Sequence, residues 1–358
     1  MALDRIALSH FRNHRQTELR GTAQLNLLFG ENGAGKTNIL EAISLLSPGR
    51  GLRRAPLADL PGPEGGGGFQ IGASLIEQGH ESARIGTFVD PERQTRRLVR
   101  VNGAEASAQS LSEWLAVGWL TPAMDGLFMD SAGARRRYMD RLALAIEPAH
   151  ARHVSRYEAA LRERNKLLEE NRDATWLDAI EAQVAEHGAA IAAGRATLVA
   201  TLADELTSLP AEPFAKPVLS YLPGGPTERE ELRAELSRQR GRDRAAGRTL
   251  TGPHRDELDV VMAGSAQPAA SCSTGEQKAM LIALTLAHAG LAAEGRPGVL
   301  LLDEVAAHLD PVRRAALFER LRAGRAQVWL TGTELAPFEE IRDHAAAWKV
   351  NAGTVERL

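Results

Sequence analysis

The sequence predicts an α/β protein in which a mixed sheet is interrupted by an inserted, all-helical lobe. Three observations predict this class: a glycine-rich loop directly after an apolar run, apolar runs separated by glycine and proline in both terminal thirds, and a middle segment rich in Ala, Leu, Glu and Arg. Strands on both sides of a helical block can share one sheet only if the helices form an excursion from it. We therefore expect a discontinuous domain of residues 1–130 and 246–358, with a helical lobe at residues 131–245.

The N-terminal third contains short apolar or alternating runs that predict the strands of a mixed sheet around the glycine loop. These runs are Ile6–Phe11, Leu25–Phe29, Phe69–Ile76, Ala83–Val89 and Leu98–Val101. The segment from Gly62 to Gly68 contains four consecutive glycines and Pro63, so we expect it to be a loop.

The middle segment, from Ser131 to Arg244, has few β-branched residues and long spans without proline. Its apolar residues recur at helical spacings, which predicts about four or five helices. These residues are Tyr157, Leu161, Leu168, Leu177, Ile180, Val184, Ile191, Leu198, Leu202 and Leu206. A proline- and glycine-bearing turn from Leu209 to Pro226 is expected to interrupt them.

The last third returns to alternating strands and helices. The expected order is a strand at Leu258–Met262, a helix at Gly275–Ala293, a strand at Val299–Leu302, a helix at Val312–Leu321 and a strand at Val328–Thr331. Since these elements resume the α/β pattern, we assign them to the same domain as the first third.

Composition is typical of a globular protein with a sizeable core. The chain has 358 residues, of which 44% are hydrophobic and 25% charged. No apolar stretch approaches the roughly 18 residues that a membrane helix needs, and the first residues do not read as a secretory signal. The one cysteine, Cys272, excludes an internal disulfide framework and a cysteine metal cluster. We expect a cytoplasmic protein without membrane partners.

The net charge of -3 argues against a uniformly basic nucleic-acid binder, but a local basic face remains compatible with it. Arginines gather in three clusters: Arg93, Arg96, Arg97 and Arg100; Arg135, Arg136 and Arg137; and Arg238, Arg240, Arg242, Arg244 and Arg248. The alternative for each cluster is a solvated helix face whose arginines have acidic partners.

A complete phosphate-binding loop follows the run that ends at Phe29. It reads Gly30-Glu31-Asn32-Gly33-Ala34-Gly35-Lys36-Thr37, and Asn38 continues into the expected helix. Glycines let backbone N–H groups surround phosphate oxygens, the helix N-terminus and Lys36 supply positive charge, and the Thr37 hydroxyl can bind Mg²⁺. The loop predicts an ATP site in which Lys36 also serves catalysis.

Two carboxylates end the apolar strand at Val299–Leu302, where functional residues of a parallel sheet gather. Asp303 is expected to hold Mg²⁺, usually through water, and Glu304 to polarise the water that attacks the γ-phosphate. The alternative is a core strand that ends at a helix start, where acids are favoured in any case. The phosphate loop favours the catalytic interpretation.

Ser273-Thr274-Gly275-Glu276-Gln277 lies directly before a long helix and has the form of the signature motif of ABC-type ATPases. A helix N-terminus with a serine cap and a glycine is a second anion site, although a plain helix cap gives the same pattern. In ABC-type folds the signature comes from the partner subunit, so Ser273, Gly275 and Glu276 are expected to contact the ATP of a second copy. Asp310 occupies the D-loop position, where it would sense the partner.

These motifs together resemble the RecF family of ABC/SMC-like ATPases over the whole chain. Further runs carry the resemblance: Phe11-Arg12-Asn13, Thr121-Pro122-Ala123-Met124-Asp125, Arg135-Arg136-Arg137-Tyr138-Met139-Asp140-Arg141, and Thr251-Gly252-Pro253-His254-Arg255-Asp256-Glu257-Leu258. Within the last run, Gly-Pro-His-Arg-Asp is the most family-specific, because generic ABC ATPases lack it. Two positions depart from the family pattern: Glu276 replaces a common glutamine, and His308 stands in the D-loop.

The resemblance implies an ATP- and Mg²⁺-dependent DNA clamp of recombinational repair. Two copies would dimerise on ATP at single-strand gaps or junctions of single- and double-stranded DNA. With RecO and RecR they would promote RecA loading, in DNA replication and the SOS response. Weak, DNA-stimulated ATP hydrolysis would act as a release switch.

Two other functions share the motifs. An SMC-like ATPase subunit or tether would need a long coiled coil with sustained heptads. An ABC transporter ATPase would have a switch histidine where this chain has Thr331-Gly332-Thr333. This sequence has neither the long run of heptads nor the switch histidine, which favours the repair ATPase.

Overall fold

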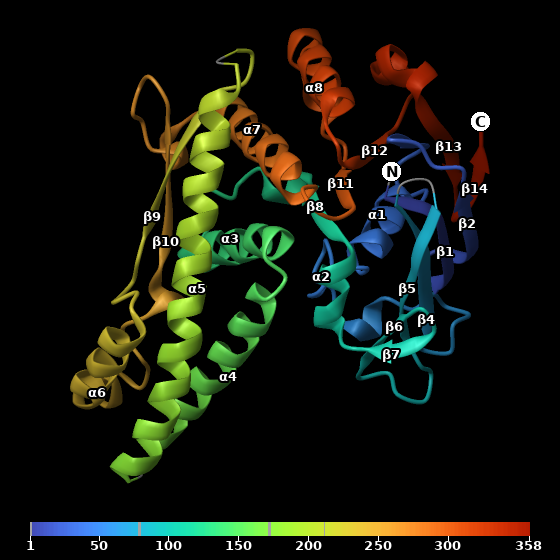
Figure 1. Cartoon of the computed structure of the whole chain (residues 1–358). Helices are drawn as coiled ribbons and strands as arrows, with labels where there is room; N and C mark the ends of the chain where they lie inside the picture. Colours follow the sequence, from blue (N-terminus) through green and yellow to red (C-terminus); the bar gives the residue numbers. More distant parts are fainter. Residues whose placement is uncertain (1, 78–79, 171–172, 211) are drawn as a thin grey trace. The chain divides into compact units, whose positions relative to one another are not determined.

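A computed structural model describes residues 2–77, 80–170, 173–210 and 212–358. The chain forms two compact units (Figure 1). The first unit comprises Met1–Asp125, Pro210–Phe214 and Leu281–Leu358, and the second comprises Gly126–Leu209 and Ala215–Met280. The first unit is discontinuous, as expected for the ATPase domain, but its bounds differ from the expected ones, because residues 126–130 and 246–280 belong to the second unit and residues 210–214 to the first.

An antiparallel sheet makes up one part of the first unit. Its strand order is β2-β1-β4-β5-β6-β7. The bounds are β1 Leu3–Phe11, β2 His14–Arg20, β4 Phe69–Glu77, β5 His80–Val89, β6 Arg97–Val101 and β7 Ala104–Ala106. The prediction of one mixed sheet around the glycine loop is therefore wrong for these strands, which pair only with one another. Hairpin connections favour such antiparallel pairing between neighbours in sequence.

A second sheet of the first unit carries the glycine loop. Its order is β14-β13-β3-β12-β11-β8. The bounds are β3 Leu25–Phe29, β8 Ala116–Leu120, β11 Gly298–Leu302, β12 Gln327–Gly332, β13 Ala345–Asn351 and β14 Thr354–Arg357. All neighbours are parallel except β14, which is antiparallel to β13. Every residue of β11 and β12 is buried, as the continuous apolar runs predict.

Helix α1 (Lys36–Ser44) connects the two sheets of this unit, because it contacts β1 on one side and β8 and β12 on the other. The other helices of the unit are α2 (Leu111–Trp114), α8 (Pro311–Ala323) and the C-terminal part of α7 (Thr274–Ala292). Short 3₁₀ turns are η1 (Leu57–Asp59), η2 (Ala108–Ser110), η3 (Pro122–Met124), η6 (Ala306–His308) and η7 (Ala336–His344). The sheets and α1 share one hydrophobic core.

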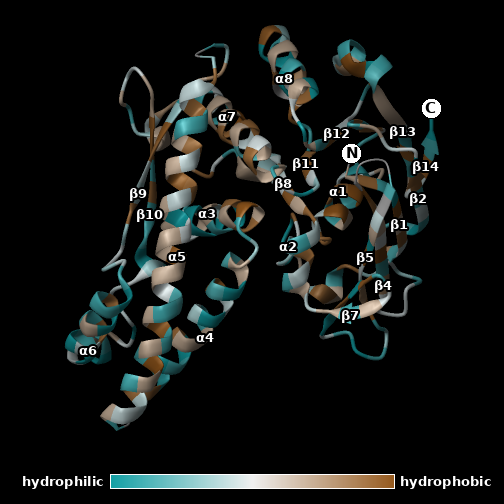
Figure 2. Cartoon of the chain, in the orientation of Figure 1, coloured by the Kyte–Doolittle hydropathy of each residue, from teal (hydrophilic) through white to brown (hydrophobic). Residues whose placement is uncertain are grey.

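The second unit is mainly helical. Its helices are α3 (Ala132–Ile146), α4 (His150–Glu169), α5 (Ala174–Ser208), α6 (Arg229–Ala246) and the start of α7, with η4 at Pro253–Arg255 and η5 at Ala269–Ser271. Most of the apolar residues that predict α5 are buried, and α6 is mostly hydrophilic (Figure 2), since only Leu232, Leu236 and Asp243 are buried on it. Among the described residues, no helix has the length and apolar character needed to cross a membrane.

The lobe is not all-helical, which corrects one part of the prediction. Strand β9 (Pro217–Leu222) lies inside it and pairs antiparallel with β10 (Glu257–Met262). The alternating burial of β9 was hidden by the flanking prolines and glycines, which indicated a turn. Strand β10 pairs with β9 and not with the sheet that carries the glycine loop, although the sequence predicts it in the same domain as that sheet.

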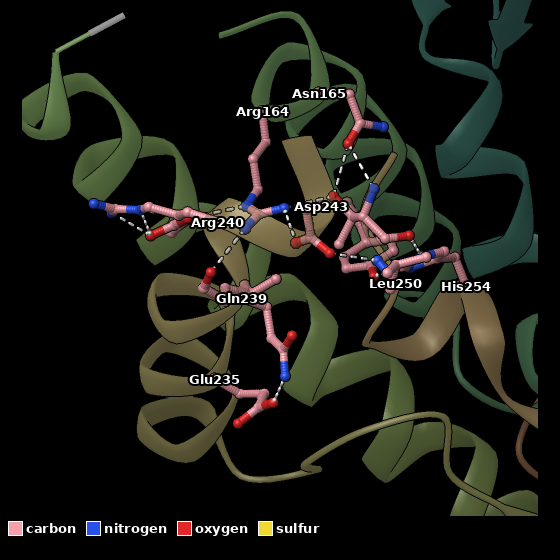
Figure 3. A network of polar contacts seen from close by, with 12 residues as sticks. Arg164, Asn165, Glu235, Gln239, Arg240, Asp243, Leu250 and His254 are labelled. Carbon is pink, nitrogen blue, oxygen red and sulfur yellow. Dashed lines mark hydrogen bonds and ion pairs between the residues drawn. The ribbon is translucent and has the colours of Figure 1, made fainter. Parts of the chain in front are cut away.

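A buried polar network joins the helices of the second unit (Figure 3). Arg164 of α4 is 0% exposed and donates to Glu181 of α5 at 3.0 Å and to Asp243 of α6 at 2.7 Å. It also donates to the Thr249 hydroxyl at 2.7 Å and to the Leu236 carbonyl at 2.8 Å. Since each charge is paired and hydrogen-bonded, the network specifies how α4, α5 and α6 pack.

The Gly-Pro-His-Arg-Asp run also has internal partners in this unit. The Nε2 of His254 donates to the Thr249 carbonyl at 2.9 Å, and its Nδ1 lies 2.8 Å from the Tyr157 hydroxyl. Asp256 accepts from Arg195 at 2.8 Å and from the Gly224 N–H at 2.8 Å. His254 is therefore a satisfied turn residue.

Candidate nucleotide-binding site

The glycine loop is shaped by close backbone approaches. Gly30 has φ 151, and a Cβ there would clash with the carbonyl oxygen of Val350. Gly33 has φ 81, and Gly35 has φ 115, with a Cβ position only 2.7 Å from both Asn13 Oδ1 and His14 Nε2. Positive φ and contact with neighbours both require glycine at Gly35. The loop then turns directly into α1, and the N-terminus of a helix is a favourable place for phosphate oxygens.

Lys36 spans the loop. Its Nζ donates to the carbonyl oxygens of Gly30 at 2.6 Å and Glu31 at 2.9 Å, and the residue is only 4% exposed. Burial lowers the pKa of Lys36, while the charges of Glu304 and Asp303 act in the opposite direction. A cation held over the loop by two carbonyls can exchange them for phosphate oxygens, which is the task expected of this residue.

Thr37, Asp303 and Thr331 form a second polar group beside the loop. The Thr37 hydroxyl donates to Asp303 Oδ1 at 3.0 Å, and the Thr331 hydroxyl donates to the same oxygen at 2.8 Å. Asp303 is 7% exposed, and its N–H donates to the Leu120 carbonyl at 3.0 Å. The parallel register explains the meeting, because the carboxyl ends of β3, β12 and β11 lie at one edge of their sheet.

The hydroxyl oxygen of Thr37 and the carboxylate oxygen of Asp303 are placed to bind a divalent cation. A hydroxyl and a carboxylate oxygen 3.0 Å apart match adjacent positions around Mg²⁺, whose bonds are about 2.0–2.1 Å long. Within the described part of the chain, no group of three or more His, Cys, Asp or Glu side chains is placed to hold a metal. A cation at Thr37 and Asp303 would therefore take its other ligands from nucleotide and water.

Glu304 follows Asp303 in a left-handed backbone conformation, with φ 54. Its N–H donates to the Thr331 hydroxyl at 2.9 Å, and its side chain is partly exposed. A non-glycine residue with positive φ is held by its surroundings at a cost of about 1 kcal/mol or more, and such residues cluster at functional sites. The role of Glu304 as the hydrolytic base stays a prediction.

Replacing Thr331 should impair the metal site without changing the packing of β12. We expect Thr331→Val to raise the Mg²⁺ concentration for half-maximal ATP turnover by about tenfold, because it removes the hydroxyl that orients Asp303. It should also lower the free energy of unfolding by about 1–3 kcal/mol, since the Glu304 N–H loses its acceptor. The measurement is a magnesium titration of ATP turnover. The exposed Thr333→Val is the matched control, and equal curves for both variants would show that Thr331 does not act on the metal.

The outer half of the loop is supported by two turns from other parts of the first unit. Asn13 Nδ2 and the Gly353 N–H donate to the Ala34 carbonyl at 3.0 and 2.9 Å. His14 Nε2 donates to the Gly35 carbonyl at 3.0 Å, and its Nδ1 lies 2.9 Å from the Thr17 hydroxyl.

His14 is fully buried, and burial lowers its pKa against the effect of its bonds to Gly35 and Gly353. A neutral imidazole therefore holds the loop backbone. Neither His14 nor Gly353 was recognised from the sequence, because both act through contacts with residues distant in the chain.

Asn38 also lies in this support. Its Nδ2 donates to Asn13 Oδ1 at 2.8 Å, and its Oδ1 accepts from Arg53 at 2.6 Å. Arg12 and Arg53 both donate to Glu41 of α1, at 2.9 and 3.0 Å. The side chain of Asn38 is thus engaged beside the loop, and its contact with nucleotide stays a prediction.

The signature residues belong to the second unit, where they form a capping box at the start of α7. Ser273 Oγ accepts the Glu276 N–H at 3.3 Å, and the Ser273 N–H donates to Glu276 Oε2 at 2.8 Å. Glutamine and glutamate both complete this motif, which explains why the chain can carry Glu276. Ser273 and Gly275 are exposed, and a Cβ at Gly275 would meet no atom within 4 Å.

Asp310 has a structural role at the start of α8. Its Oδ1 accepts the Arg313 N–H at 3.0 Å, and its other oxygen lies 3.6 Å from the Arg313 guanidinium. It is an N-cap of the kind that stabilises helices by about 1 kcal/mol. Its contact with a partner copy stays a prediction.

The three arginine clusters separate into internal and exposed members. Arg97 donates to the carbonyls of Ser47 and Gly49. Arg135 pairs with Glu257 at 2.7 Å, and Arg136 donates to the Asp256 carbonyl. Arg240 bonds to Glu181 of α5, and Arg244 bonds to the Leu168 carbonyl of α4. Burial lowers the pKa of Arg97 to about 10. The exposed members are Arg93, Arg96, Arg100, Arg137, Arg238, Arg242 and Arg248, and Arg244 is also exposed although its guanidinium bonds to α4. The internal members are structural.

Comparisons with known proteins show the family to which the chain is similar. The family model described as RecF/RecN/SMC N terminal domain matches residues 2–355. Proteins named DNA replication and repair protein RecF from Mesorhizobium japonicum and Brucella suis are each 47% identical to the chain. They cover 99% of it and 97% and 95% of their own lengths. The relative of that name from Rhizobium leguminosarum is 45% identical, over 99% of the chain and 98% of its own length.

Solved structures show the same fold. The recombination mediator protein RecF-ATPrS in the RecFOR pathway superposes with a TM-score of 0.87 at 25% identity, covering 99% of this chain and 98% of its own. The Smc head domain of Pyrococcus furiosus, bound to the C-terminal domain of ScpA, has a TM-score of 0.55 at 15% identity. The match covers 100% of this chain and 96% of that chain, and at this identity it shows a likeness of fold alone. These likenesses confirm the expected ABC-type ATPase head.

Proposed function

The chain belongs to the RecF family within the RecF/RecN/SMC ATPases, and from this premise we propose that it is an ATP-dependent DNA clamp of recombinational repair. Its relatives are named DNA replication and repair proteins, and a similar solved structure is that of RecF-ATPrS in the RecFOR pathway. The observation that carries the proposal is the arrangement of Lys36, Thr37 and Asp303, whose charges and oxygens suit a triphosphate with Mg²⁺.

Two copies would close on two ATP molecules. Each site would combine the phosphate loop of one copy with Ser273 and Gly275 of the other, and Asp310 would lie near the partner. The start of α7 supports this, because Ser273 and Gly275 are exposed there and a helix N-terminus attracts anions. Glu304 would activate water for slow, weakly DNA-stimulated hydrolysis, which reopens the clamp.

The DNA target would be a single-strand gap or a junction of single- and double-stranded DNA, bound without regard to sequence. RecO and RecR would be partners there, and RecA loading the outcome. The exposed arginines support contacts with the DNA backbone, since guanidinium groups bind phosphate oxygens and no DNA-reading motif accompanies them. The relatives at 45–47% identity favour this function over that of an SMC tether.

The test is DNA binding as a function of salt and nucleotide. We expect affinity for gapped DNA to fall by about a hundredfold or more between about 50 and 200 mM salt, because backbone contacts release counterions. Affinity should be higher with ATP than with ADP, since only ATP would close two copies around DNA. Equal binding to two unrelated sequences is the control for backbone recognition. Binding that depends on neither salt nor nucleotide would contradict the clamp.

A further inference from the structure

A carboxylate holds the serine of the signature motif. The Ser273 hydroxyl donates to Glu276 Oε2 at 2.7 Å, and the Ser273 N–H donates to the same oxygen at 2.8 Å. Ser273 Oγ accepts the Glu276 N–H in return, at 3.3 Å. A hydroxyl has one proton to donate, and here that proton is used by Glu276. Ser273 can donate to a phosphate oxygen only after Glu276 releases it.

The same carboxylate places negative charge where the helix attracts anions. Glu276 is the acidic residue in the first turn of α7. Its pKa lies below the usual value, first because of the bond from the Ser273 hydroxyl and then because of the bond from its backbone, so the group is ionised at neutral pH. A charge at this position stabilises the helix and opposes a second anion at the same helix end.

We propose that Glu276 is an electrostatic brake on the ATP-dependent closure of two copies. It occupies the Ser273 hydroxyl and repels the γ-phosphate that the second copy presents to this helix. Closure requires the Glu276 side chain to leave Ser273 and turn into solvent. The inference rests on the proposed two-copy ATP site, and it names the group that regulates that site.

The brake has a consequence for the order of events. ATP can shift an open–closed equilibrium only by its difference in affinity for the two states. Repulsion at Glu276 makes that difference smaller at each of the two sites. The binding energy of DNA then contributes to closure, so DNA should shift ATP-bound copies further toward the closed dimer.

The substitution Glu276→Gln separates the charge from the helix cap. Glutamine completes the capping box in the same way, because its carbonyl oxygen accepts from the Ser273 N–H and hydroxyl. It removes the negative charge alone. Glu276→Ala removes the cap as well, and Glu294→Gln makes the same chemical change at an exposed position beyond the other end of α7.

The experiment is sedimentation of these variants with ATP and Mg²⁺, each combined with Glu304→Gln to suppress hydrolysis. A unit charge about 5 Å from a phosphate oxygen costs about fourfold in affinity under water-like screening, and two such sites make about tenfold or more. We expect Glu276→Gln to lower the dimer dissociation constant by that amount, and Glu276→Ala to do so too. Glu294→Gln should have no effect, and the difference should shrink in about 1 M salt and vanish with ADP.

Three results would overturn the inference. If Glu276→Gln dimerises no more tightly than its parent, there is no brake, while the ATP-dependent dimer of the parent keeps the proposed function. If it dimerises less tightly, the carboxylate assists closure. If no variant associates with ATP, the two-copy site and the brake are both wrong. Equal melting temperatures of Glu276→Gln and its parent show that the fold is unchanged.

Discussion

Glu304→Gln is expected to lower ATP turnover by about a hundredfold to ten-thousandfold while ATP still binds. General-base catalysis contributes about this much, and glutamine keeps the size of glutamate without its basicity. Both residues have the same backbone preferences, so the φ of 54 at this position should be retained. Because hydrolysis reopens the clamp in the proposed cycle, the variant should accumulate as an ATP-bound dimer.

The measurement combines ATP turnover with gel filtration in ATP and Mg²⁺. Glu319→Gln on α8 is the matched control, since Glu319 is exposed and its replacement removes the same charge in the same unit. It should hydrolyse ATP and elute as the wild type does. If Glu304→Gln remains monomeric under conditions in which the wild type dimerises, Glu304 is not simply the hydrolytic residue.

The core of the nucleotide site could be predicted from the sequence because its signals are local. The strand at Leu25–Phe29 has the predicted bounds, and α1 and β11 begin within two residues of the expected positions. A phosphate loop needs its glycines, lysine and threonine at set spacings, and a buried parallel strand needs a continuous apolar run. Local chemistry therefore determines both the phosphate loop and the strand that ends at Asp303. The structure brings Thr37 and Asp303 together as expected.

Elements that depend on distant pairing could not be predicted in this way. Strand β13 contains Ala345, Ala346 and Ala347, which give no strand signal, and it forms because it adds to β3. Strands β9 and β10 form one pair within the second unit, although 34 residues separate Leu222 from Glu257.

The residues that support the glycine loop could not be predicted either, because they are distant from it in the sequence. His14 lies 21 residues from Gly35, and the turn at Gly353 lies near the other end of the chain. No periodicity or motif relates these positions. Asn13 was part of a family motif, but only the structure shows that it bonds to the Ala34 carbonyl.

The second large effect is expected for Ser273→Arg. A guanidinium at the exposed start of α7 is too large for a site that depends on a small hydroxyl and Gly275, so two copies should not close. ATP binding to the separate copies should be unchanged, because the phosphate loop belongs to the first unit. Turnover should fall to the level of Lys36→Met, which loses the cation of the loop. Ser237→Arg on α6 is the control, since it adds the same side chain at another exposed serine.

One ATP site is proposed to consist of residues from two copies of the chain, and mixing Ser273→Arg with Lys36→Met tests this composition. Each mixed dimer has one site with both intact halves, Lys36 from one copy and Ser273 from the other, and one site with both halves broken. We predict that two inactive proteins regain a substantial part of wild-type ATP turnover on mixing, in proportion to the mixed dimer formed. The two-copy site is contradicted if Ser273→Arg alone hydrolyses ATP and dimerises like the wild type. It is also contradicted if the mixture stays as inactive as its two parts.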